Sequence, residues 1–207
     1  MSGFVAAVDG GGGIIVVIVA FGGLIPIFFV IATYNRFARL RQHVAESWSD
    51  IDVELKRRYE LIPNMVEVVK GYARHERDVL ESVVRLRDRA RANHGTAASQ
   101  AVDEAAMLGG LRQVFVIAER YPMLRADANF LALQRELANT EDRIAAARRF
   151  YNGNVREMTQ LLQTFPTSFV GSAFKFERPT YFELSSEAER VVPRANLEPI
   201  TQPGVPG

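Results

Sequence analysis

The sequence predicts an all-α protein in which an N-terminal transmembrane helix is followed by an antiparallel up-and-down bundle of long helices. Three observations predict this class. Residues Ile14 to Ala32 form an uninterrupted apolar run. Apolar residues then recur every three or four positions, which is the spacing of one buried helical face. Later in the chain, large apolar residues fall seven apart, the repeat of helices that pack along a seam.

The run from Ile14 to Ala32 contains no charged, amide or hydroxyl side chain. At about 1.5 Å per residue it spans close to 30 Å, the thickness of the hydrocarbon core of a bilayer. The alternative, a central helix of a soluble core, is disfavoured because such a helix usually carries a polar stripe. Residues 1–13 contain no Lys or Arg, whereas a cleavable signal peptide begins with a basic region. We therefore expect a short flexible head at 1–13 and an uncleaved anchor at 14–32.

The charges beside this run predict its orientation. Nothing basic precedes it, and Arg36, Arg39 and Arg41 follow at once. The positive-inside rule then places the C-terminal side in the cytoplasm and the N-terminus outside.

The rest of the chain, from 33 to 184, is predicted to form the bundle. Its first helix is expected to run from Thr33 to about Ala92, with Pro63 interrupting the pattern without ending it. Trp48 lies in register with the apolar face and is predicted to be a core anchor. That face comprises Val44, Trp48, Ile51, Leu55, Tyr59, Ile62, Val66, Val69, Ala73, Leu80, Val83, Leu86 and Ala90.

A second helix is predicted from about Ser99 to Tyr121. It ends there because Pro122 disfavours helical geometry at the residue before it. Gly109 and Gly110 lower its intrinsic stability, and we interpret them as positions where another helix packs closely.

A third helix is predicted from Ala128 to about Thr164, with Asp127 as its N-cap and Pro166 as its stop. A free coiled coil would also fit its heptad seam, but short connections to neighbouring helices favour an intramolecular bundle. The seam consists of Phe130, Leu137, Ile144, Tyr151, Met158 and Phe165.

Aromatic residues crowd the segment that follows Pro166, and we call residues 167–184 the aromatic strap. We expect it to lie back over the bundle, because so many aromatic rings are unfavourable in water. Contact with a membrane surface is the alternative. The strap contains Phe169, Phe174, Phe176, Tyr181 and Phe182, and the polar, Pro-rich stretch at 185–207 is predicted to be disordered.

Composition and motifs give little support to catalysis. The net charge of +1 does not favour nucleic-acid binding, and the absence of Cys excludes thiol chemistry. The first two histidines, His43 and His75, would lie about nine turns apart on one helix, and no Glu-x-x-His motif of a di-iron bundle occurs. Nucleophile-elbow and zincin motifs do not occur either. The sequence therefore predicts no catalytic, cofactor-binding or metal-binding residues.

The basic triplet Lys56, Arg57 and Arg58 is the sharpest charge feature. One interpretation is a solvated face with local ion pairs from Asp52 to Lys56 and from Glu54 to Arg58. The other is a docking patch for an acidic partner or for lipid headgroups. The triplet is the candidate partner-docking site.

A series of short motifs in order along the chain resembles the LemA family of bacterial membrane proteins. The resemblance extends from about Tyr34 to Phe182, with departures at Glu54 and at Met158-Thr159. It rests on the stretch from Trp48 to Val66, on Val69-Lys-Gly-Tyr72, His75-Glu76, Glu119-Arg-Tyr-Pro122 and Asn129-Phe130, and on Leu133-Gln-Arg-Glu-Leu137, Thr140-Glu141, Arg149-Phe-Tyr151-Asn152, Val155 and Phe165-Pro166.

The resemblance implies an N-terminal anchor and a LemA-like bundle without established catalytic residues or cofactors. Some relatives shape intracellular membrane compartments of magnetic bacteria. We expect a non-enzymatic, single-pass protein of the bacterial inner membrane, held in the bilayer by Ile14 to Ala32. Its cytoplasmic bundle would bind or scaffold partner proteins. Membrane shaping by self-assembly into a homo-oligomer is the alternative, and an enzyme whose residues converge only in the fold is a third.

Overall fold

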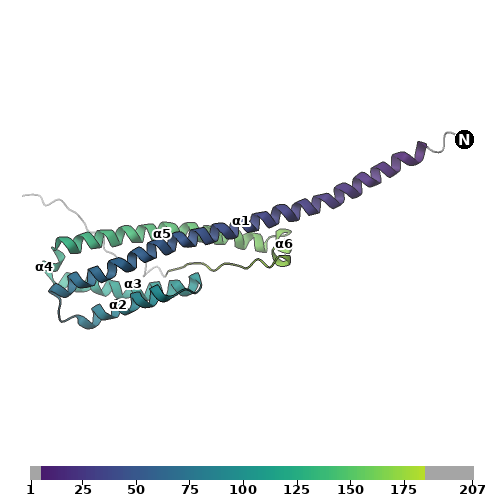
Figure 1. Cartoon of the computed structure of the whole chain (residues 1–207). Coiled ribbons are helices and arrows are strands. Elements are labelled where there is room, and N and C mark those ends of the chain that lie inside the picture. The colour runs from purple at the N-terminus through teal and green to yellow at the C-terminus, as the bar shows by residue number, and fades with distance from the viewer. Residues whose placement is uncertain (1–5, 185–207) are drawn as a thin grey trace, which may run out of the picture. The chain divides into compact units, whose positions relative to one another are not determined.

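The computed structural model describes the backbone of residues 6–184 and the side chains of residues 23–184. Every regular element in the described chain is a helix, as the sequence predicts. The predicted head at 1–13 is described only from Ala6, where α1 begins, and the predicted disordered tail at 185–207 lies outside the described residues. The helices are α1 (Ala6–Tyr72), α2 (Arg77–Ala92), α3 (Ala97–Arg120), α4 (Pro122–Arg125), α5 (Ala128–Gln163) and α6 (Thr167–Ala173) (Figure 1).

Among the described residues, no helical stretch is both long and apolar enough to cross a bilayer. The predicted transmembrane helix from Ile14 to Ala32 is therefore not confirmed. Its residues 14–22 belong to the part of α1 whose side chains the structure does not describe.

The chain divides into two compact units, and both contain parts of α1 and α5. Unit 1 consists of Met1–Ala45 and Gly153–Pro179, and unit 2 consists of Glu46–Asn152 and Thr180–Gly207.

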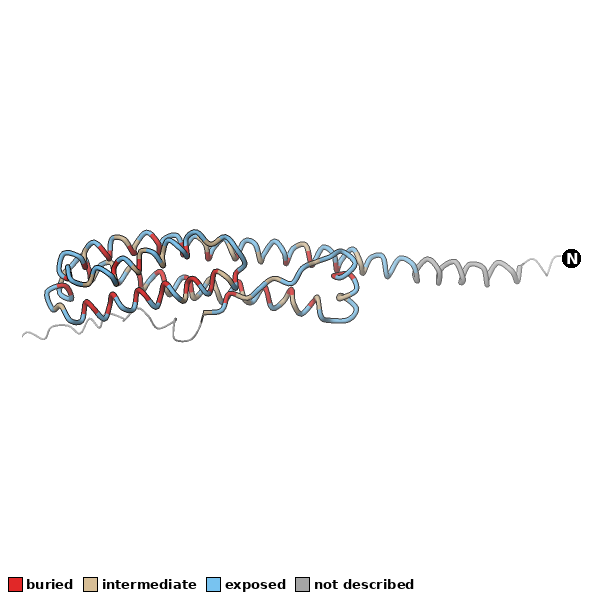
Figure 2. Tube along the Cα trace, turned by 90° about the horizontal axis from the view of Figure 1, so that it is seen from below, coloured by how far each residue is buried: buried red, intermediate tan, exposed pale blue. Residues whose placement is uncertain are grey.

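Unit 2 is a helical bundle with an apolar interior, in which the buried positions recur along one side of each helix (Figure 2). The apolar spacing read from the sequence fixes which face is buried, because residues three and four apart lie on one side of a helix. Its interior includes Ile51, Leu55, Ile62, Leu80, Leu108, Leu111, Leu137 and Ile144.

The predicted single helix from Thr33 to about Ala92 is wrong in its middle, because α1 ends at Tyr72 and α2 begins only at Arg77. Gly71 lowers the helix propensity at the break. After the turn, α2 packs against α3 (Figure 1). It buries its own apolar face, including Val83. The apolar spacing runs on across the turn, so periodicity alone did not reveal it.

The predicted helix starts and the predicted close approach of helices are largely confirmed. Asp127 Oδ1 accepts hydrogen bonds from the backbone N–H groups of Asn129 and Phe130, both at 2.9 Å, and so caps α5. At Gly110 an added Cβ would lie 2.9 Å from Leu86 Cδ1, whereas at Gly109 it would meet nothing within 4 Å. Close packing therefore explains Gly110 and not Gly109.

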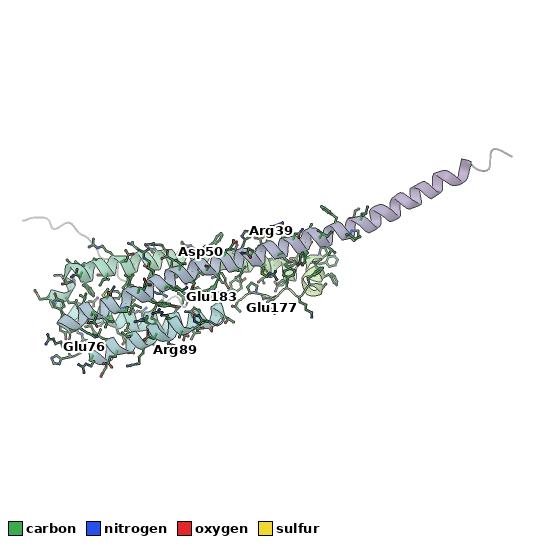
Figure 3. All side chains as sticks on the ribbon, in the orientation of Figure 1. Arg39, Asp50, Glu76, Arg89, Glu177 and Glu183 are labelled. Atoms are coloured by element: carbon green, nitrogen blue, oxygen red, sulfur yellow. The ribbon has the colours of Figure 1, made fainter. Side chains whose placement is uncertain are left out.

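Unit 1 contains the end of α5, the short helix α6 and the first described side chains of α1. Its small core includes Phe37, Leu40, Met158, Leu161 and Val170. The side chains of this unit include those of Arg39 and Glu177, which Figure 3 labels.

The aromatic strap covers the protein only in part. In unit 2, Phe182 is fully buried, and its ring centroid lies 5.6 Å from that of Trp48. In unit 1, Phe176 stacks on Phe37 at 4.8 Å. Phe169 and Phe174 remain exposed, as does Phe165, the last residue of the predicted seam. The strap therefore packs through some of its rings and presents others to the surroundings.

Candidate functional site

A charge network lies in the interior of unit 2, and its centre is Arg58. The side chain of this residue is 0% exposed. Its guanidinium forms ion pairs with Glu104, which is also fully buried, and with Glu141 at 2.5 Å. Since these residues belong to α1, α3 and α5, one guanidinium links three helices.

Glu104 accepts further hydrogen bonds on the same carboxylate. The Tyr59 hydroxyl and the Gln100 side-chain amide, the latter at 2.8 Å, both donate to Glu104 Oε1. The Gln100 amide also donates to the Ala90 carbonyl of α2 at 3.0 Å, so the network reaches the fourth long helix. Buried polar groups are costly unless they are bonded in this way.

The pKa values of the two central donors follow from this environment. Burial by itself lowers the pKa of Arg58, but the charges of Glu141 and Glu104 together outweigh it, and the pKa lies above its ordinary value. Burial raises the pKa of Tyr59, and the neighbouring Glu104 charge adds to that effect. Arg58 therefore stays charged and Tyr59 stays protonated, so both remain donors over the physiological pH range.

This arrangement is suited to fixing the register of the helices. One cation and two carboxylates leave a formal charge of −1, with Glu141 reaching partly toward solvent. A slip of one helix against another would separate buried opposite charges, which is strongly unfavourable.

The three residues of the predicted docking patch differ in exposure and in their ion-pair partners. Lys56 is exposed and pairs with Asp52 at 2.6 Å, as the sequence predicts. Arg57 is about half exposed and pairs with Glu136 of α5. Arg58 is buried and has no surface that a partner can reach.

The predicted pair between Glu54 and Arg58 is wrong, because Arg58 points inward to Glu104 and Glu141. Glu54 instead faces Arg143 of α5, with a closest distance of 3.8 Å. The docking role of Lys56 and Arg57 stays a prediction.

The sequence contains a signal for the buried network that the triplet obscures. Arg58 lies three residues after Leu55 and four before Ile62, so it falls within the apolar pattern of α1. Charged residues occupy similar core positions in the other two helices: Glu104 precedes Leu108 by four residues, and Glu141 follows Leu137 by four. One basic and two acidic residues at core positions of three helices indicate a buried ion-pair network.

A groove of about 360 Å³ opens beside the network, with Lys56 and His94 among the residues that line it. Tyr59 and Gln100 also line it, and both are already bonded to Glu104. Within the described side chains, no three His, Asp or Glu residues are arranged to hold a metal ion. The described residues thus define an all-α bundle with a buried charge network in its interior and an exposed basic pair on its surface.

Comparison with known proteins places this bundle in a family. The model of the LemA family matches residues 47–196. Protein LemA of Metamycoplasma hominis is 25% identical over 165 residues, which cover 79% of this chain and 74% of that protein. The match to the family model spans most of the chain, and the chain belongs to the LemA family.

Two further similar proteins carry the name magnetosome protein. MamQ of Magnetospirillum gryphiswaldense is 20% identical, over 74% of this chain and 65% of that protein. MamQ 2 of Paramagnetospirillum magneticum is 21% identical, over 74% of this chain and 66% of that protein. The chain thus spans about two thirds of the length of these two relatives. None of the three names describes an enzymatic activity.

Proposed function

We propose that this protein is a non-enzymatic, single-pass membrane protein of the bacterial inner membrane whose cytoplasmic bundle binds or scaffolds partner proteins. Ile14 to Ala32 form the anchor, and the N-terminus lies outside.

The observation that carries the proposal is the exposure of the first described side chains of α1. Large apolar side chains there are between 53% and 75% exposed, which is unfavourable in water and favourable in lipid. These side chains are Leu24, Ile25, Ile27, Phe28 and Ile31. The described helix then becomes basic, at Arg36, Arg39 and Arg41, as expected at the cytoplasmic end of an anchor.

The surface proposed for partner binding is the pair Lys56 and Arg57. Exposed ion pairs such as theirs contribute about 0–1 kcal/mol to stability, so both side chains can exchange their present partners for those of an acidic protein. Arg58 beneath them keeps this turn of α1 in place, because its partners lie on two other helices.

Topology is tested with two reporters fused after Gly207. A fluorescent protein that folds in the cytoplasm should be active, and an alkaline phosphatase that folds in the periplasm should be inactive. Active phosphatase would overturn the orientation. Release of the chain from membranes by alkaline carbonate would overturn the anchor.

Docking is tested by the double variant Lys56→Glu, Arg57→Glu, with crosslinking in native membranes. Crosslinks to partners should disappear while the melting temperature stays near that of wild type. The matched control is Arg85→Glu on α2, where the side chain is likewise exposed and forms only a 3.9 Å pair with Glu81. Equal loss of crosslinks in the control, or none in the double variant, would overturn docking through this pair.

A second candidate function is membrane shaping by self-assembly, and the observation that favours it is the similarity to two proteins named magnetosome proteins. It predicts that the full chain forms oligomers on vesicles and changes their curvature. Vesicles that keep their shape at saturating protein would exclude it.

A further inference from the structure

We propose that the turn after α5 and the short helix α6 form a second membrane contact, in which Phe165 and Phe169 insert into the interfacial region of an anionic bilayer. The proposal rests on the proposed function, because it requires the α1 anchor in the same bilayer.

The first observation is an exposed aromatic pair. Phe165 is 76% exposed and Phe169 is 69% exposed, and their rings meet edge to face with centroids 5.8 Å apart. The heptad seam of α5 predicts that Phe165 points inward, like the five seam residues before it. Those five are buried, and Phe165 alone of the seam faces outward. Two adjacent exposed Phe rings form an apolar surface of the kind that contacts lipid or protein.

The second observation is the level of α6 along α1 within unit 1. An added Cβ at Gly171 would lie 3.2 Å from the Phe37 ring, so α6 touches α1 at that turn. Val170 belongs to the same small core, against which Phe29 and Val30 of α1 also pack. Phe29 and Val30 lie in the last turn of the predicted anchor. The aromatic pair is therefore near the point where the anchor leaves the hydrocarbon, the level at which aromatic side chains gather at membranes.

The direction of α5 agrees with this placement. Asn154 donates a hydrogen bond to the His43 carbonyl at 3.3 Å, and further along α5, Glu157 pairs with Arg36 at 3.0 Å. Within unit 1, α5 and α1 are therefore antiparallel. The helix runs toward the anchor and ends beside it, where the chain reverses into α6 (Figure 1).

The third observation is charge, and it favours anionic lipid over a second copy of the chain. The described side chains of unit 1 include six basic residues and two acidic ones, although the whole chain has a net charge of only +1. Two copies would bring these positive surfaces together, whereas anionic headgroups attract them. The basic residues are Arg36, Arg39, Arg41, Arg156, Lys175 and Arg178, and the acidic residues are Glu157 and Glu177.

The chain is well suited to a direct test, because it contains no Cys. Single-cysteine variants of this 207-residue chain can be labelled with an environment-sensitive fluorophore and reconstituted in vesicles of phosphatidylcholine and phosphatidylglycerol. Phe169→Cys reports on the proposed contact. Phe28→Cys reports on the anchor, because the Phe28 side chain on α1 is 75% exposed. Phe150→Cys in unit 2 is the matched control, because this Phe is 62% exposed and lies outside unit 1.

The proposal predicts a distinct quenching pattern for each site. The label at 28 should be quenched by nitroxides deep in the acyl chains, the label at 169 by nitroxides near the headgroups, and the label at 150 only by a water-soluble quencher. Quenching at 169 should weaken when phosphatidylglycerol is omitted. Unchanged quenching there would overturn the role of lipid charge.

The other outcomes separate this inference from the proposed function. A label at 169 that is quenched only from water, with the label at 28 quenched by lipid, refutes the second contact and leaves the anchor standing. Water quenching at 28 refutes the anchor and the inference with it. The label at 169 could also be protected from the lipid nitroxides and from the water-soluble quencher alike. If the Phe169→Cys variant, labelled instead with a nitroxide spin label, then shows dipolar broadening between two copies, a second copy covers the aromatic pair and the inference is refuted.

Discussion

Replacing Arg58 with methionine tests what the bundle loses when the buried network is broken and Glu104 is left without its cation. Methionine keeps much of the length and apolar volume of the arginine stem but removes its charge. Glu104 then stays fully buried without its guanidinium, while Glu141 keeps some contact with water.

The expected loss in free energy of unfolding depends on the contacts that each carboxylate keeps once the guanidinium is removed. Removing one partner of a buried ion pair costs about 3–5 kcal/mol. We expect the lower end, near 3 kcal/mol, because Glu141 can be solvated and because Tyr59 and Gln100 still donate to Glu104. At roughly 2–4 °C per kcal/mol for a protein of this size, the melting temperature should fall by about 6–12 °C.

The assay is thermal unfolding of the full chain in detergent, followed by circular dichroism. Arg57→Met is the matched control, because it makes the same substitution one position earlier at a side chain that is 45% exposed. Its cost should be about 0–1 kcal/mol. Adding Glu104→Gln to Arg58→Met removes the stranded buried charge and should recover part of the loss, which a double-mutant cycle measures.

Equal melting temperatures for Arg58→Met and Arg57→Met would refute the reasoning. A double variant that melts below Arg58→Met would also contradict it, because the stranded charge of Glu104 would then not be the source of the loss.

Three further outcomes are expected from unfolding measurements. Gly109→Ala should raise the free energy of unfolding by about 1 kcal/mol through helix propensity. Gly110→Ala should be less stable than Gly109→Ala by about 1–3 kcal/mol, because its methyl group meets Leu86. Denaturant midpoints that rank the two variants in the opposite order would contradict this. Trp48→Ala should lower the free energy of unfolding by about 2 kcal/mol. This is less than the roughly 3–5 kcal/mol expected for a fully buried Trp, since Trp48 is only partly buried. A loss of partner crosslinks with an unchanged melting temperature would make Trp48 a binding residue instead. Asp127→Ala should lower the melting temperature at neutral pH, and the difference from wild type should shrink in acid. The reason is that backbone and Tyr72 hydrogen bonds hold the folded pKa of Asp127 below its ordinary 3.8. A difference that grows as the pH falls would show that capping by the carboxylate is not the cause.

The helical class and most of the buried faces could be predicted from the sequence. Spacings of three, four and seven residues are properties of one helix, and they identify its apolar side wherever that side packs. The cap at Asp127 was predictable because capping depends on local backbone geometry. The Gly109-Gly110 pair indicated a close approach of another helix, but only the fold shows that Gly110 and not Gly109 makes it. The break after Tyr72 was not, because the apolar spacing continues through the turn.

The sequence determined that α1 carries a basic triplet beside its apolar face, and that the seam of α5 reaches Phe165. Only the tertiary structure decided that Arg58 lies inside and Phe165 outside. The partners of Arg58 lie 46 and 83 residues away along the chain, so its burial depends on where two other helices place their carboxylates. α5 ends at Gln163, so the heptad spacing no longer determines where the Phe165 ring points. Burial is settled by the groups that meet a residue from elsewhere in the chain, and spacing along one helix does not contain that information.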